Sequence, residues 1–257
     1  MSIATDYRNS VSLGNYTWWS PWYGCEKVSP ACLNCYIKVR NFCLADIDGT
    51  QELASCAPGT IVITSLLTDF FWDEADDYRE RAWAFIRNNP HLIFLIITKK
   101  LDHGITVLPP DWGDGWNNVI IKATIDNNEY AAIRIPQLRN FPAKHKWLAC
   151  SPLIEELDLE AFLAEGWIEH VECSGEIGNP EVIRETRHSW VKSLSDQCKK
   201  TGVRFSFMKC GNKFITTENK MLSDSSYCYQ SEVADTFNLS YYVPIRFELA
   251  DGTIQII

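Results

Sequence analysis

Long apolar runs recur along the chain, and each has the length of a strand buried on both faces, as in a parallel sheet. They are separated by polar stretches of roughly twenty residues, which is the spacing of alternating strands and helices. A shorter aromatic stretch, Tyr16 to Tyr23, precedes them and reads as an extended segment. We therefore predict about seven strands, which start near residues 16, 60, 92, 118, 146, 168 and 203.

Between these strands the apolar positions follow a helical period. Pro90 lies just beyond one such segment, and Gly202 follows another at the place of a C-cap. A third segment contains Pro136, where we expect a boundary or a kink. The helices predicted in this way cover residues 36–44, 74–89, 129–138 and 187–200.

The spacing of the strand starts, roughly 22–35 residues, is the length of a βα unit. The fold class predicted is therefore α/β, as a partial or full (β/α) barrel, with a doubly wound sheet as the alternative. Residues 211–257 have a different pattern, with two short apolar runs flanking Asp251-Gly252 as in a β-hairpin. We expect a barrel domain over 1–210 and a C-terminal extension over 211–257 that packs on one end of the barrel.

Composition narrows the class of protein. Apolar residues form 46% of the 257, which is enough for a full core, and the net charge of −9 argues against strong non-specific binding to nucleic acid. Ten cysteines without a signal peptide point to a reducing compartment, so we expect a cytoplasmic protein. No stretch has the length of apolar sequence needed to span a membrane, so we expect no membrane partner.

Polar and reactive residues follow almost every predicted strand. In parallel α/β folds the carboxyl ends of the strands carry the chemistry, so these residues are expected to meet at one mouth. Singly, each has an ordinary structural explanation, such as a helix cap or a solvated loop. The residues concerned are Thr64, Ser65, Asp69, Thr98, Lys99, Lys100, Thr124, Asp126, Asn128, Cys150, Ser151, Glu172, Cys173, Ser174, Glu176, Lys209 and Cys210.

One loop, residues 24–36, carries three cysteines in a C-x6-C-x2-C spacing: Cys25, Cys32 and Cys35. Its Gly, Ser and Pro residues place the first two cysteines in a loop rather than in a helix or strand. Three thiolates with an open position suit an iron–sulfur cluster. The alternatives are a zinc site completed by Cys43 or a distant His, and three ordinary buried thiols.

A cysteine loop that follows a first strand resembles the cluster loop of the radical S-adenosylmethionine (SAM) superfamily. The chain is more closely similar to a phage-associated family of three-Cys-motif proteins, and loosely similar to spore photoproduct lyase. The resemblance runs from about Trp18 to Gly211 and is carried above all by Trp22-Tyr23-Gly24-Cys25 and Cys32 to Tyr36. The cysteine loop departs from the usual C-x3-C-x2-C spacing of the superfamily. The chain also has Ser151 where the family has a glutamate, which suggests a divergent member of the family with a different substrate.

The resemblance implies a radical SAM enzyme in which Cys25, Cys32 and Cys35 hold a [4Fe-4S] cluster and the fourth iron takes SAM. The cluster would cleave SAM to a 5′-deoxyadenosyl radical that abstracts a substrate hydrogen. Cys150, Cys173 and Lys99 are the catalytic candidates, the thiols as hydrogen donors and Lys99 as a partner of an anionic group. The cofactor-binding candidates are Tyr36, Thr64, Ser65, Asp69, Thr98, Thr124, Asp126, Asn128, Ser174 and Glu176.

Such an enzyme needs an electron donor such as flavodoxin or ferredoxin, and a partner protein encoded nearby is a further expectation. For the substrate we favour a nucleotide or nucleic-acid base, because aromatic residues around Trp18 and Phe70 would stack a base near the mouth. Lysines and arginines beside the strand ends would contact phosphates. The alternative is a binding module in which the metal or cluster is structural and SAM is not turned over.

Overall fold

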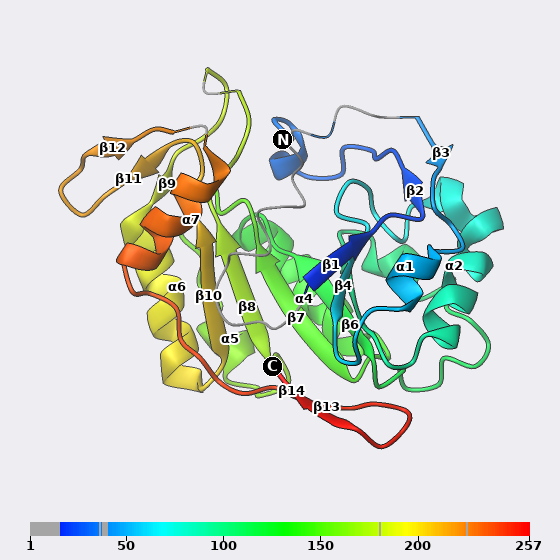
Figure 1. Cartoon of the computed structure of the whole chain (residues 1–257). Helices are drawn as coiled ribbons and strands as arrows, with labels where there is room; N and C mark the ends of the chain where they lie inside the picture. The colour runs from blue at the N-terminus through cyan, green and yellow to red at the C-terminus, as the bar shows by residue number, and fades with distance from the viewer. Residues whose placement is uncertain (1–15, 36, 38–40, 180, 225) are drawn as a thin grey trace.

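The computed structural model describes residues 16–35, 37, 41–179, 181–224 and 226–257. Its main element is a parallel sheet of seven strands that curls into a half-barrel (Figure 1). The strands stand in the order of the chain, with β1 and β10 at the two edges. They are β1 (Tyr16–Trp19), β4 (Ile61–Thr64), β5 (Ile93–Thr98), β6 (Val119–Thr124), β7 (His145–Cys150), β8 (His170–Ser174) and β10 (Arg204–Lys209).

This sheet confirms the prediction of seven strands and a partial barrel. The full barrel is not formed, because β1 and β10 have no hydrogen-bonded ladder between them in the described chain. The doubly wound alternative is wrong, since that fold reverses its strand order at a switch point and this sheet does not. Each strand pairs in parallel with its neighbour, so all seven carboxyl ends lie at the same end of the sheet.

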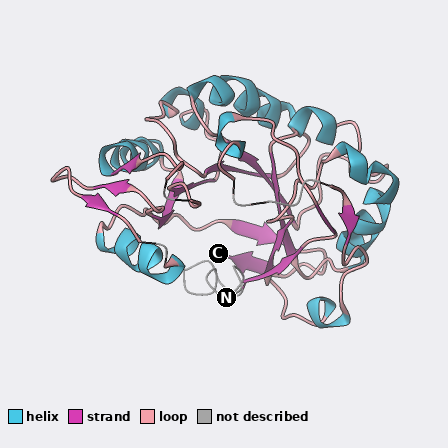
Figure 2. Ribbon diagram, turned by 90° about the horizontal axis from the view of Figure 1, so that it is seen from above, coloured by secondary structure: helices cyan, strands magenta, loops and turns pink. Residues whose placement is uncertain are grey.

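Helices cover the convex side of the half-barrel, as the arc outside the strands in Figure 2 shows. Their apolar side chains pack with alternate strand residues such as Val62, Phe94 and Leu148 in the larger of two buried clusters. The helices of this region are α1 (Gln51–Ala54), α2 (Asp76–Asn88), α3 (Leu101–Gly104), α4 (Asn128–Asn140), α5 (Glu160–Leu163) and α6 (His188–Thr201). The 3-10 turn η3 (Pro30–Cys32) lies in the cysteine loop, and η4 (Asp73–Ala75) precedes α2.

The predicted helix boundaries agree closely for α2 and α6, and Gly202 ends α6 in the left-handed conformation with φ of 73°. Helix α4 confirms the helix predicted over 129–138, and Pro136 lies inside it instead of at a boundary. One helix prediction fails. The helix predicted over 36–44 is absent from its described residues, because Cys43–Leu44 forms strand β3 against Trp22–Tyr23, strand β2.

The C-terminal part adds small elements to the half-barrel. Strands β9 (Thr186–Arg187), β11 (Phe214–Ile215) and β12 (Met221–Leu222) form a three-stranded sheet, and helix α7 (Tyr227–Thr236) packs beside β10, where Ser231 donates to the Met208 carbonyl at 3.1 Å. No helix in the described part of the chain has both the length and the apolarity to cross a membrane.

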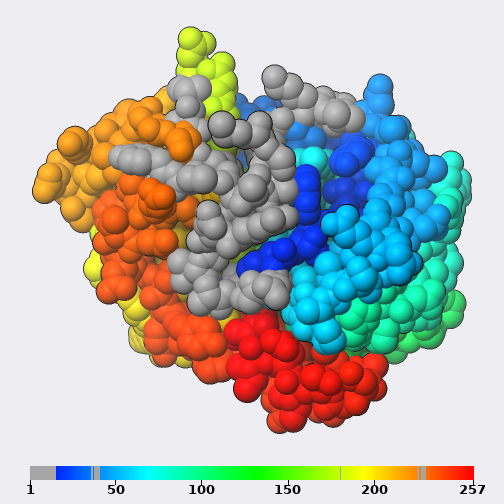
Figure 3. All heavy atoms as spheres, in the orientation of Figure 1, coloured from blue at the N-terminus to red at the C-terminus, as the bar shows by residue number. Residues whose placement is uncertain are grey.

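A hairpin of β13 (Arg246–Glu248) and β14 (Ile254–Ile256) confirms the hairpin predicted around Asp251-Gly252. Phe247 of the hairpin packs on the concave face of the sheet together with the flanking Ile245, Leu249 and Ile257, against residues in the first half of the strands such as Ile61, Ile93 and Trp147. Figure 3 shows this C-terminal segment, in red, along the lower edge of the molecule. The hairpin therefore fills the end of the half-barrel opposite the carboxyl ends of the strands.

Candidate active site

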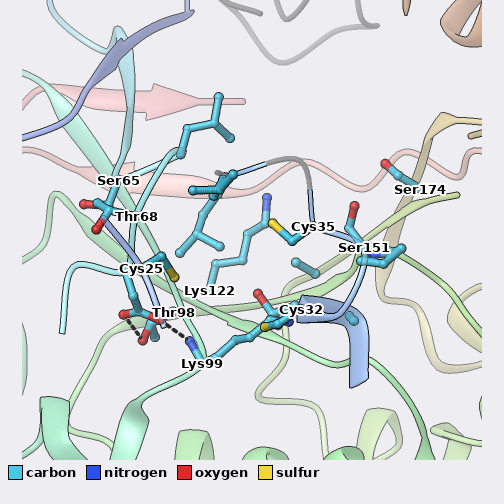
Figure 4. Close-up of a pocket in the computed structure, with 18 of the residues that line it drawn as sticks. Cys25, Cys32, Cys35, Ser65, Thr68, Thr98, Lys99, Lys122, Ser151 and Ser174 are labelled. Carbon is cyan, nitrogen blue, oxygen red and sulfur yellow. Dashed lines mark hydrogen bonds between the residues drawn. The ribbon is translucent and has the colours of Figure 1, made fainter. Parts of the chain in front are cut away.

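A pocket opens at the carboxyl ends of the strands and is lined by residues from all three regions that the sequence singled out: the cysteine loop, the strand ends and the segments after them. Its volume is about 220 Å³, far above the 10–15 Å³ or so that one water needs, so it has room for a ligand. Figure 4 shows the three cysteines around the same space as Ser65, Lys122 and Ser151. The sequence-predicted residues that line it are Cys25, Cys32, Cys35, Ser65, Asp69, Thr98, Lys99, Thr124, Ser174 and Glu176.

The cysteine loop enters the pocket through a backbone turn that only glycine accommodates well. Gly24 has a φ of 106°, and a Cβ there would lie 2.4 Å from the Asn41 carbonyl oxygen and 2.5 Å from the Trp72 ring. The Thr68 hydroxyl donates to the Gly24 carbonyl, which ties the loop to the segment after β4. Pro30 then begins the turn η3, which ends at the buried Cys32. Local backbone chemistry thus presents the cysteines to the pocket.

Cys32 lies in an electrostatic environment that favours its thiolate. Burial raises the pKa of the thiol. The Lys99 ammonium, the Ser29 hydroxyl and nearby backbone N–H groups together lower it by more than burial raises it, so the net pKa falls below the usual value. The Lys99 Nζ lies 3.4 Å from the Cys32 Sγ and donates to the Ser29 hydroxyl at 2.9 Å. A thiolate is the form that binds metals, so Cys32 is prepared as a ligand.

This environment predicts a measurable change in thiol reactivity. A thiolate persists above its pKa, so Cys32 in the metal-free protein should keep reacting with iodoacetamide at pH values where an ordinary thiol is protonated. Lys99→Met removes the nearest positive charge and is expected to raise the pKa, shifting the alkylation profile of Cys32 by about one pH unit or more towards alkaline pH. Mass spectrometry of peptides alkylated across a pH series reads this residue separately from the others. An unchanged profile in Lys99→Met would contradict this account.

Lys99 itself is oriented by a fully buried carboxylate. The Asp126 Oδ1 lies 3.0 Å from the Lys99 Nζ and 3.6 Å from the Arg134 guanidinium, and Asp126 is 0% exposed. Arg134 also donates to the Thr124 carbonyl at 2.8 Å and stacks over the Tyr130 ring. Because Asp126 does not line the pocket, it acts behind Lys99 rather than on a ligand.

Asp69 is likewise committed to protein contacts. Its carboxylate accepts hydrogen bonds from the Thr98 hydroxyl at 2.8 Å, from the Lys99 backbone N–H at 2.8 Å and from the Phe71 N–H at 3.0 Å. Burial raises the pKa of Asp69, while these hydrogen bonds oppose the rise. The residue fixes the end of β5 against the segment after β4, and so sets where Lys99 stands.

Ser65 offers an unsatisfied polar group to the pocket. Its side chain is 1% exposed, and among the described residues its hydroxyl has no hydrogen-bond partner. The residue also has a φ of 66°, in the left-handed region that non-glycine residues rarely adopt. A buried polar atom without a partner costs free energy unless a ligand or water satisfies it, so Ser65 is a strong candidate for ligand contact.

The floor of the pocket carries an ion pair that the sequence analysis missed as a unit. Lys122 on β6 donates to Glu172 on β8, across β7, where the small Ala149 leaves room for the two side chains to meet. All three residues line the pocket. Lys122 is the one charged residue of β6, and a charge inside a buried strand is the signal that could have pointed to it.

Two catalytic candidates lie on the wrong face of the sheet. Cys150 and Cys173 are completely buried among the apolar residues of the convex side, together with Cys198 of α6, and neither lines the pocket. Burial raises the pKa of both thiols. Side chains alternate between the faces of a strand. Cys150 lies two residues after Leu148 and Cys173 two residues after Val171, so both cysteines are on the face of these core residues. We therefore reassign them from hydrogen donors to core packing; Cys210 is also in this cluster.

Three cofactor-binding candidates also turn out to serve the protein itself. The Thr64 hydroxyl donates to the Val62 carbonyl at 3.2 Å and does not line the pocket. Asn128 holds the segment after β7, with its amide donating to Glu155 and to the Glu156 carbonyl at 2.8 Å. Glu176 lines the pocket, but Arg184 occupies its carboxylate. Tyr36 lies outside the described residues.

The features that suggested a nucleic-acid surface are mostly internal. Trp19, Trp22, Phe70 and Phe71 are at most 3% exposed, and pack among themselves and with other core rings. Of the cations expected to meet phosphates, four are held by carboxylates: Lys99, Lys100, Arg184 and Arg187. The stacking platform predicted beside the mouth is therefore wrong for these four rings, because their apolar surface is used in the core. Trp18 and Tyr23 of the same set are each 39% exposed.

Metal groups differ in how closely their protein ligands must stand to one another. Among the described residues no three His, Cys, Asp or Glu side chains are close enough to hold one metal ion. A structural zinc site draws its ligands to within about 2.3 Å of a single centre. A four-iron cluster is larger and takes each cysteine on a different iron, so its ligands stand further apart around a shared space. Cys25, Cys32 and Cys35 all line the one pocket.

Comparison with known proteins places the chain in a family. No curated protein and no solved structure matches it. One family model, DUF5131, described as a protein of unknown function, matches residues 10–232 and so includes the cysteine loop and all seven strands of the half-barrel. On this match, the chain belongs to the DUF5131 family.

Proposed function

We propose that this protein is a radical SAM enzyme that uses a [4Fe-4S] cluster on Cys25, Cys32 and Cys35. The observation that carries the proposal is that the three cysteines of one loop line one pocket at the carboxyl ends of a parallel half-barrel. In parallel α/β folds this end of the sheet is where catalytic residues collect. The resemblance of the loop to the radical SAM cluster loop supports the same reading.

The residues present fit the cluster. Ligating cysteines must be deprotonated, and the lowered pKa of Cys32 beside Lys99 meets that need at one of the three positions. When bound, the cluster would supply the electron that cleaves SAM to methionine and a 5′-deoxyadenosyl radical. The role of the protein is to hold the cysteines in place and to exclude water from the pocket through the aromatic core beside the loop.

The residues present also offer polar contacts to SAM. The Ser65 hydroxyl is buried and without a partner in the described chain, so it is placed to accept a hydrogen bond from the amino group of the methionine part. Thr124 and Ser174 line the same pocket from β6 and β8 and supply further hydroxyls. Asp69 and Glu176 already accept hydrogen bonds from Lys99 and Arg184, so we assign them to positioning those residues and not to binding the cofactor.

For the substrate we propose a small polar molecule, with a nucleotide among the candidates. The Lys122–Glu172 pair on the pocket floor, together with Ser151 and Ser174, gives this side both hydrogen-bond donors and acceptors. A long nucleic-acid strand has less support, because the cations and rings that would follow its backbone are already engaged in the fold.

Anaerobic purification followed by iron, sulfide and zinc analysis tests the cluster directly. We expect about four irons and four sulfides per chain, and conversion of SAM to 5′-deoxyadenosine and methionine after addition of a reductant. Stoichiometric zinc without labile sulfide would contradict the proposal. A cluster-loaded protein that neither binds nor cleaves SAM would favour the alternative, a binding module stabilised by its cluster.

A further inference from the structure

The described residues of the connection between β8 and β9, 175–179 and 181–185, contact the cysteine loop. Arg184 donates from its guanidinium to the Pro30 carbonyl at 3.1 Å. Asn34 donates from its side-chain amide to the Val182 carbonyl at 2.9 Å. These bonds join segments about 150 residues apart in the chain, one on each side of Cys32. The cysteine loop is therefore held from its far side by an element outside its own motif.

Arg184 is fixed in direction by Glu176. The Glu176 carboxylate, 3% exposed, accepts from the Arg184 backbone N–H at 2.6 Å, from its Nε at 2.9 Å and from one terminal nitrogen. The other terminal nitrogen is the one that donates to Pro30. A guanidinium is a planar fork, so two bonds to one carboxylate determine where its remaining N–H groups point. Lysine, with a single ammonium on a flexible chain, cannot bridge both partners in this way.

Glu176 in turn stands on rigid backbone. Gly175 touches the end of β10 so closely that a Cβ there would lie 2.0 Å from the Cys210 carbonyl oxygen. The Asn212 N–H donates to the Glu176 carbonyl at 2.9 Å, and the Asn212 side chain accepts from the Gly178 N–H at 2.8 Å. The carboxylate is thus anchored to two strands of the half-barrel, and through Arg184 it transmits that position to the loop.

We propose that Arg184, oriented by Glu176, is a positioning residue that fixes the Pro30 side of the cysteine loop and keeps the three thiols arranged for a shared ligand. The contact itself is independent of the proposed function; its consequence for cluster binding rests on that function. The competing explanation is that the Glu176–Arg184 pair only stabilises its own connection. The two explanations differ in whether loss of the pair changes the cysteine loop.

Hydrogen–deuterium exchange of the metal-free, reduced protein separates them. Arg184→Lys removes the guanidinium fork, and Glu176→Gln removes the charge and one of the two acceptor oxygens that orient it. In both variants we expect amide exchange within residues 28–35 to rise by about tenfold through local opening, with the strands of the half-barrel unchanged. Arg187→Lys is the matched control, because Arg187 belongs to the same part of the chain but pairs with Glu185 at the surface. The control should exchange as the unaltered protein does.

Cluster uptake provides the second readout. Reconstitution with iron and sulfide is expected to be several-fold slower in Arg184→Lys than in the Arg187→Lys control, and the spectrum of the reduced cluster broader, because less ordered ligands must be gathered first. Unchanged exchange in the loop, or a rise spread over the whole chain, would overturn the positioning role. A loop that loosens as expected in a protein that never takes up iron and sulfide would sustain this inference and refute the proposed function.

Discussion

Replacement of Cys25, Cys32 or Cys35 by alanine is expected to abolish SAM cleavage. Each variant removes one of the three thiols that we propose as cluster ligands, all of which line the pocket. Because the cluster supplies the chemistry that the side chains cannot, 5′-deoxyadenosine formation should fall by about a thousandfold or more, not by the smaller factor typical of a lost contact. Anaerobic chromatography of the reaction products measures this directly.

Cys43→Ser is the control for that experiment. Cys43 is exposed on β3, outside the pocket, and is the residue that would complete a four-cysteine zinc site. We expect this variant to retain iron, sulfide and SAM cleavage. Loss of metal in Cys43→Ser, equal to the loss in the three loop variants, would instead point to a closed site with four ligands.

Lys122→Met is expected to lower the free energy of unfolding by about 3–5 kcal/mol. It leaves the Glu172 carboxylate buried at the pocket floor without the ammonium that now pairs with it. The double variant Lys122→Met/Glu172→Leu removes both charges and should recover most of that loss, because the desolvation cost disappears together with the attraction. Urea unfolding of the metal-free protein, monitored by tryptophan fluorescence, compares the three chains. A double variant as unstable as the single one would show that the pair is not the source of the loss.

The Lys122–Glu172 pair is also placed to contact a ligand in the pocket. A buried ion pair is weak as a device for stability, since well-packed apolar residues of the same volume serve at least as well. Its position on the pocket floor, over Ala149, gives it another use: it presents charge to whatever occupies the pocket. The double variant should therefore fold well and still fail to process the substrate, which separates stability from recognition.

The architecture could be predicted because its signals are local. Three of these signals depend only on neighbouring residues. They are the continuous apolar runs of strand length, the helical periods between them, and Gly202 after α6. The helix predicted over 36–44 failed at Cys43 for the opposite reason. Its apolar spacing fits a helix, but Cys43 pairs with Tyr23 and Phe42 stacks on Tyr78, and such partners are not visible in a window of nine residues.

The site was predicted by position along the strands but not by face. Every strand of a sheet covered on both sides is apolar at odd and even positions alike, so the pattern does not mark which face meets the pocket. Thr124 and Ser174 have the alternation of Lys122 and Glu172 and line the pocket, whereas Cys150 and Cys173 have the opposite one. The charged residues inside β6 and β8 carried that information, because an ionised side chain must face the cavity or a partner.

The order of the strands leaves the half-barrel with two edges, β1 and β10. In a closed barrel an unbroken ring of hydrogen bonds sets the diameter, so the mouth can widen only by adding strands. Across the open side of this sheet, no ladder joins the two edges in the described chain, so hydrogen bonds between strands do not fix their separation. The width of the mouth is therefore adjustable by substitution along two short strands, without any change to the cysteine loop or to the backbone that carries it.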